Sequence, residues 1–106
     1  MGEPLGAEDV KLVVLARAAM ARSEAKSGAA VRDRDGRSYT GVPVNLAALR
    51  LTGLQAAVAA AVSSGTTGLQ AAALVGGSLD DPGIAALREL SPMAVVIVTD
   101  STGSPL

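Results

Sequence analysis

Few residues in this sequence have side chains suited to chemistry, and the carboxylates stand out among them. Asp80 and Asp81 are adjacent and precede Pro82. Two neighbouring carboxylates can hold Mg²⁺ or exchange protons with a substrate. The same pair before a proline also has the pattern of a helix start, where acidic side chains cap free N–H groups and complement the helix dipole. We favour the helix start over the metal or acid–base site.

A second acidic group, Asp33-Arg34-Asp35-Gly36, resembles the opening of a calcium-binding loop. The later acidic ligand of such a loop is missing, because position 44 is a valine. Asp-Gly is a strong signal for a β-hairpin turn, so a turn is the better interpretation. Arg32, Arg34 and Arg37 flank it and could contact phosphate, but the interleaved aspartates favour a solvated turn.

Other potential sites lack an essential partner. The chain contains no histidine and no cysteine, which excludes a serine triad at Ser63 or Ser64, a thiol nucleophile and a thiolate metal ligand. Gly76-Gly77-Ser78 could approach a phosphate, but no P-loop lysine accompanies it and two aspartates follow. We therefore expect no metal and no cofactor.

Composition narrows the class of protein further. With 106 residues, the chain has the size of one domain, which we assign to residues 1–106 with an ordered core at about 8–100. A net charge of −1 and a single aromatic residue, Tyr39, argue against nucleic-acid binding. The core must consist of small aliphatic side chains, which favours burying more surface in a homodimer or homotetramer.

The location expected from the sequence is the cytoplasm. Met1-Gly2-Glu3-Pro4 carries an acid and no basic stretch typical of a signal peptide. No charged residue occurs from Leu51 to Leu79, but polar residues 63–68 divide this segment into halves too short to span a membrane. We therefore expect two buried elements joined by a loop, and no membrane partner.

The elements that must position these residues follow from periodicity and turn signals. Residues 8–25 form a helix with Val10, Val13, Val14, Arg17 and Ala21 at spacings of three and four, and residues 44–50 are irregular. Thr52 and Gln55 have the spacing of a capping box at the start of a helix that is apolar nearly all round and hence buried. The strand at 93–99 is apolar on both faces, as in a central or parallel strand, and residues 100–106 are a polar tail. The predicted elements are helices at 8–25, 52–64 and 82–90 and strands at 29–33, 37–42, 69–75 and 93–99.

This order, αββαβαβ, predicts a three-layer α/β fold with a mixed sheet and helices on both faces. It also resembles the cytidine deaminase family over about residues 10–100. The local sequence agrees at the first hairpin, 28–37, at Thr40-Gly41 and at the end of the second helix, Val62-Ser63-Ser64-Gly65. The resemblance implies a cytidine deaminase-like fold, whose subunits pack around the helices that carry the active site.

The family's chemistry needs three zinc ligands and a glutamate that moves a proton. The resemblance sets Gly53-Leu54-Gln55 at the place of ligand-x-Glu, and Pro82–Ala86 at the place of Pro-Cys-x-x-Cys. Gly53, Gly83 and Ala86 thus replace the ligands and offer no donor, and Gln55 replaces the proton carrier. Neither zinc nor a catalytic residue is expected at these positions.

The sugar-binding segment of the family also differs here. Pro43 stands where the family has an asparagine, and Asn45 stands where it has a glutamate. Asn45 could bind a polar ligand or cap a loop. Gln55 could hydrogen-bond a ligand in a remnant pocket or serve only the capping box with Thr52, which we favour.

We therefore predict a zinc-less, non-catalytic cytidine deaminase homologue that binds a nucleoside-like ligand or a protein. The alternative is a nucleoside deaminase or hydrolase that works through an unrecognised or partner-supplied site. Bound zinc and cytidine turnover distinguish the two.

Overall fold

The computed structural model describes residues 5–106; Met1–Pro4, on which the expectation of no signal peptide depends, lie outside it. The helices are α1 (Ala7–Ser23), α2 (Gly53–Ser63) and α3 (Gly83–Leu90). The strands are β1 (Gly28–Asp33), β2 (Ser38–Gly41), β3 (Val44–Asn45), β4 (Arg50–Leu51), β5 (Leu69–Val75) and β6 (Val95–Thr99). Each element predicted from the sequence is present, with boundaries that differ by two residues or fewer.

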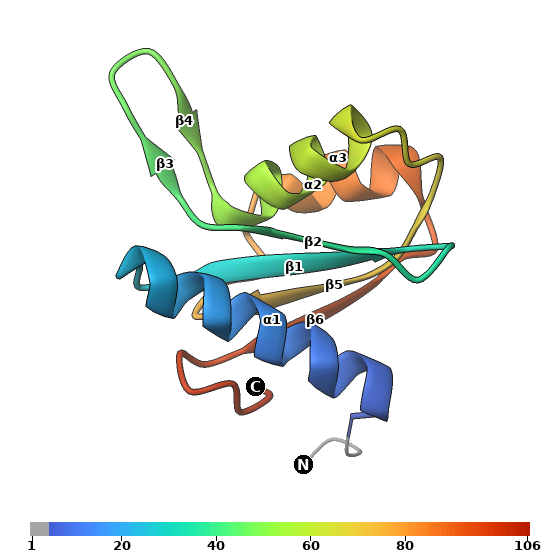
Figure 1. The fold of residues 1–106 in the computed structure, drawn as a ribbon, viewed down its shortest axis with the longest axis horizontal. Coiled ribbons are helices and arrows are strands. Elements are labelled where there is room, and N and C mark those ends of the chain that lie inside the picture. Colours follow the sequence, from blue (N-terminus) through green and yellow to red (C-terminus); the bar gives the residue numbers. More distant parts are fainter. Residues whose placement is uncertain (1–4) are drawn as a thin grey trace.

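Four strands form a mixed sheet in the order β2-β1-β5-β6. β1 pairs antiparallel with β2 and with β5, and β5 pairs parallel with β6. Helix α1 covers one face of the sheet, whereas α2 and α3 cover the other (Figure 1). The predicted three-layer α/β architecture is confirmed.

The core lies on both faces of the sheet and consists of aliphatic side chains, many of them alanines. Alanines of β1 and β5 alternate between the two layers: Ala29 and Ala72 face α2, whereas Ala30 and Ala73 face α1. Small strand residues allow the helices to approach the sheet closely, so Leu, Val and Met from the helices fill the remaining space.

Helix α1 does not bury the stripe that its spacing suggested. Leu12, Val13, Ala16, Ala19 and Met20 face the sheet, whereas Val10 and Val14 are exposed. The spacing in the sequence indicated a neighbouring apolar row of the same helix, because the exposed Val10 and Val14 follow the same period as the residues of the buried face.

Helix α2 was expected to be buried on all sides, and this expectation is wrong. Its inner face is buried, but Ala59 and Val62 are exposed, Val62 to 52%. An alanine-rich helix has too little contrast between its faces for the sequence to show which one faces solvent.

Residues 44–50, expected to be irregular, contain a small hairpin. Val44 pairs with Leu51 and Asn45 with Arg50, and Leu46 N–H donates to Leu49 O at 2.9 Å. The hairpin β3–β4 stands away from the body of the protein (Figure 1). Strands of two residues are too short for a period-2 pattern to be visible in the sequence.

Strand β6 is parallel as predicted, but it is the last strand of the sheet rather than a central one, and Val95 is exposed. The segment after it folds back instead of forming a free tail. Pro105 bridges to Thr99, and Leu106 N–H donates to Val98 O at 3.1 Å. The carboxylate of Asp100 accepts hydrogen bonds from Thr102 and Ser104 and so closes this turn.

Candidate functional site

The starts of α2 and α3 meet beside the base of the hairpin β3–β4. At the start of α2, Thr52 Oγ1 accepts a hydrogen bond from Gln55 N–H at 3.1 Å, and Gln55 Oε1 accepts one from Thr52 N–H at 2.9 Å. The predicted capping box is therefore formed. The amide oxygen of Gln55 is engaged in this cap.

Asp81 joins the two helix starts. Its Oδ1 accepts a hydrogen bond from Gly83 N–H, in the first turn of α3, at 2.7 Å. The same oxygen accepts the hydroxyl hydrogen of Thr52, the cap of α2, also at 2.7 Å. Asp81 thus caps a helix, as its position before Pro82 predicted, and in addition connects α3 to α2.

Glycines bring the backbones at this place into close contact. A Cβ added at Gly83 would lie 2.8 Å from Leu54 Cβ and Cγ and 2.9 Å from the backbone nitrogen of Gln55. A Cβ at Gly53 would lie 3.1 Å from Gly41 O. Any larger residue at position 83 therefore forces α2 and α3 apart.

The residues present do not fit the zinc centre that the fold family implies. Gly53, Gly83 and Ala86 have no donor atoms, and the packing at position 83 leaves no room for a cysteine Cβ. Within residues 5–106, no three acidic side chains gather closely enough to hold a metal ion.

A cleft of about 620 Å³ opens next to the joined helix starts. The base of the hairpin β3–β4 provides one wall, and the loop after β5 provides the other. The lining residues are Ser27, Pro43, Val44, Asn45, Arg50, Leu51, Thr52, Gly53, Gly76, Gly77, Ser78, Asp80 and Asp81. Apolar and polar groups both line this cleft, as is typical of sites for small polar ligands.

The residues predicted for the site lie in different places. Asn45 and Gly53 line the cleft, whereas Gln55 is half-buried in the capping box. Gly83 is buried between α2 and α3, and Ala86 is exposed on α3. Of the candidate ligand-binding residues, Asn45 is the one whose position suits contact with a molecule in the cleft.

Sequence reasoning missed Arg50 as a residue of the cleft. Arg50 lies in a segment that carries no recognisable strand signal, and the hairpin brings it directly opposite Asn45. The sequence did show a basic residue five positions after Asn45. Only the hairpin, however, brings Arg50 and Asn45 opposite each other.

Asp33 has a structural role in its turn. It is 2% exposed, and its Oδ1 accepts hydrogen bonds from the N–H groups of Asp35 and Arg37, each at 2.9 Å. Its Oδ2 lies 3.2 Å from the Tyr39 hydroxyl and 3.4 Å from that of Thr66. Burial by itself would raise the pKa of Asp33, but the hydrogen bonds together hold that pKa below its ordinary value. Gly36, with φ of 84°, supplies the left-handed conformation of the turn.

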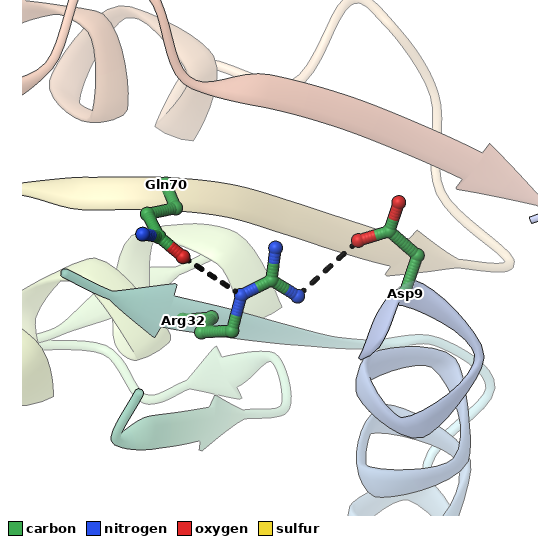
Figure 2. A network of polar contacts seen from close by, with 3 residues as sticks. All are labelled: Asp9, Arg32 and Gln70. Carbon is green, nitrogen blue, oxygen red and sulfur yellow. Dashed lines mark hydrogen bonds and ion pairs between the residues drawn. The ribbon is translucent and has the colours of Figure 1, made fainter. Parts of the chain in front are cut away.

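The arginines near this turn do not act as one cluster. Arg32 Nη1 forms an ion pair with Asp9 Oδ1 at 3.2 Å, and its Nε donates to Gln70 Oε1 at 3.1 Å (Figure 2). The pair connects α1 to β1, and Gln70 belongs to β5. The guanidinium of Arg34 lies against Gly68. Arg32 and Arg34 therefore make structural contacts in different directions and do not form a cluster with Arg37.

Comparisons with known proteins agree with this architecture. A model of the cytidine deaminase-like family matches residues 5–103. The chain therefore belongs to the cytidine deaminase-like family. A search of curated proteins found none that matches the chain.

Two solved structures are similar to it. The cytidine deaminase from Burkholderia pseudomallei has a TM-score of 0.77 and 23% sequence identity, over 91% of this chain and 87% of that chain. The cytidine deaminase from Mycobacterium leprae has a TM-score of 0.67 and 28% identity, over 83% of this chain and 85% of that chain. The first likeness shows the shared fold, and the fold predicted from the sequence is the one found. Within residues 5–106, none of the helices combines the length and hydropathy needed to cross a membrane.

Proposed function

We propose that this protein is a binding module built on the cytidine deaminase-like fold, and that it does not catalyse zinc-dependent deamination. The proposed ligand is a small nucleoside-like molecule held in the cleft beside Asn45. One observation carries the proposal. A hydrogen bond between Thr52 and Asp81, with Gly83 packed on Leu54, joins the two helix starts at which the resemblance to cytidine deaminases implies the zinc ligands.

At the positions that the resemblance implies for the three zinc ligands, this chain has Gly53, Gly83 and Ala86, which carry no donor atoms. At the position implied for the catalytic glutamate it has Gln55. A glutamine amide cannot carry a proton between atoms at neutral pH, so a water molecule at this place would have no general base in Gln55. The open cleft next to it supports retained binding, because its volume is large enough to hold a nucleoside.

The test combines metal analysis, turnover and ligand binding on the purified protein. We expect no stoichiometric zinc, no release of ammonia from cytidine, and a rise in melting temperature with at least one nucleoside or nucleotide. Stoichiometric zinc or clear turnover contradicts the non-catalytic proposal and supports a deaminase. The absence of any thermal shift at millimolar ligand contradicts the binding proposal.

We also propose that the protein self-associates as a homodimer or homotetramer. Leu46 and Leu49, at the tip of the hairpin, are exposed to 60% and 49%. The hairpin continues directly into α2, whose outer face carries the exposed Ala59 and Val62 and no charge. Exposed apolar residues on neighbouring elements support burial against a second copy. The cytoplasm remains the proposed location.

A further inference from the structure

Two of the residues that line one wall of the cleft, Asn45 and Arg50, bear an amide and a guanidinium. Asn45 and Arg50 are directly paired across β3 and β4, and both line the cleft. Side chains of directly opposed residues in an antiparallel pair lie on the same face of the strands. A ligand that reaches this wall therefore meets both groups together.

The guanidinium of Arg50 has no other engagement in the described part of the chain. The ion pair found among residues 5–106 joins Arg32 to Asp9, and the hydrogen bonds there leave the side chain of Arg50 without a partner. Arg50 is also the one basic residue among the described residues that line the cleft. Its charge is thus free to bind an anionic group of a ligand.

The opposite wall carries acidic groups of two kinds. Asp81 already accepts two short hydrogen bonds on Oδ1, from Thr52 and Gly83. Asp80 is exposed, and only its backbone N–H is engaged, by Ser78 Oγ at 3.0 Å. Asp80 can therefore accept hydrogen bonds from an amino group, and it would repel an anion placed near it.

We propose that the ligand of this cleft is a nucleoside monophosphate, with its phosphate at Arg50 and the amino group of its base toward Asp80. This inference rests on the proposed binding function and specifies the class of ligand. A guanidinium can bind two phosphate oxygens at once, which a neutral nucleoside cannot exploit. The carboxylates on the opposite wall set the orientation of the ligand, because they would repel a phosphate placed near them.

Isothermal titration calorimetry with cytidine, cytidine 5′-monophosphate and inorganic phosphate tests the inference on the wild-type chain and on Arg50→Gln. The matched control is Arg37→Gln, which removes the same charge from an exposed position outside the cleft. We expect the monophosphate to bind more tightly than cytidine. Arg50→Gln should weaken the monophosphate about tenfold or more and leave cytidine unchanged, because a hydrogen bond to a charged group is lost.

The remaining outcomes separate the two proposals. Equal binding of cytidine and its monophosphate, unaffected by Arg50→Gln, overturns the role of Arg50 and leaves the binding function intact. An equal loss of affinity for the monophosphate in Arg37→Gln also overturns the role of Arg50, because the effect would then come from the net charge of the protein. Phosphate binding as tight as that of the monophosphate contradicts a nucleotide ligand. If neither cytidine nor the monophosphate binds, both proposals fail.

Discussion

The hydroxyl of Thr52 donates a hydrogen bond to Asp81 Oδ1 at 2.7 Å and so ties the start of α2 to the start of α3. The same two groups cap their own helices, Thr52 at Gln55 N–H and Asp81 at Gly83 N–H. One hydrogen-bonded pair therefore serves two helix starts, and both of its residues line the cleft.

Removal of the Thr52 hydroxyl should destabilise the protein. Thr52→Val keeps the shape of the side chain but loses the cap of α2 and leaves Asp81 without its partner. We expect a loss of about 2 kcal/mol in the free energy of unfolding. Urea denaturation measures this loss, and Thr52→Ser, which retains a hydroxyl, should recover most of it. Equal stability of the Val and Ser variants contradicts the role of the bond.

Glycine at position 83 should be required for the packing of α3 on α2. Gly83→Ala places a Cβ 2.8 Å from Leu54 and 2.9 Å from the nitrogen of Gln55, so the helices must separate. We expect a loss of about 1–3 kcal/mol in the free energy of unfolding. Gly6→Ala is the matched control, because a Cβ there meets nothing within 4 Å. A Gly83→Ala variant as stable as the control contradicts the close packing.

Introducing the zinc ligands and the glutamate at the four positions that the resemblance implies should not by itself create a zinc site. The variant Gly53→Cys, Gln55→Glu, Gly83→Cys and Ala86→Cys supplies donors, but the side chain added at position 83 would require α2 and α3 to move apart. We expect this variant to be less stable than the wild type and to contain no stoichiometric zinc, as measured by metal analysis after dialysis. Full zinc occupancy in a variant of wild-type stability shows that the helix starts separate easily.

Acid should destabilise the protein partly through Asp33. Burial acts to raise the pKa of Asp33, but its hydrogen bonds outweigh burial and hold the pKa below the ordinary value of 3.8, so the folded state favours the carboxylate. The resulting stability is fully present above the unfolded-state pKa and is lost as pH falls through the lower pKa of the folded state. Thermal melts from pH 6 to about pH 2 should therefore show a weaker acid dependence for Asp33→Asn than for the wild type. The pKa of Asp100 is lowered too, by hydrogen bonds from Thr102 and Ser104, so Asp100→Asn is a comparison at an exposed site. Identical pH profiles for wild type and Asp33→Asn contradict this assignment.

Charges at the hairpin tip should weaken self-association. Leu46→Asp with Leu49→Asp introduces two carboxylates where the proposed interface would bury apolar side chains, and burying unpaired charges is strongly unfavourable. Sedimentation velocity should show a shift toward monomer. Ala47→Asp on the same tip tests whether one charge suffices. A wild-type chain that is monomeric at high concentration removes the basis of the proposal.

The order of the elements could be predicted from sequence because the strongest local signals lie where they begin and end. The Asp-Gly turn, the Thr52–Gln55 spacing and Asp81-Pro82 each correspond to a feature of the structure. Local hydrogen bonds between residues two to four positions apart depend on spacing alone, so the sequence shows them directly.

The resemblance to cytidine deaminases could likewise be drawn from the order of elements and short motifs, and the family assignment confirmed it. That Gly53, Gly83 and Ala86 offer no donor atoms to a metal also needs no structure, because glycine and alanine cannot bind a metal through their side chains in any fold.

Tertiary structure alone decided how these positions are used. The bond between Thr52 and Asp81 joins residues 29 positions apart, and the contact of Gly83 with Leu54 is equally distant in the chain. Whether Val62 of α2 faces solvent, and whether Arg50 faces the cleft, depended on packing that an alanine-rich sequence leaves open. The physical reason is that composition determines which groups a chain can offer, whereas only long-range packing determines which of them meet.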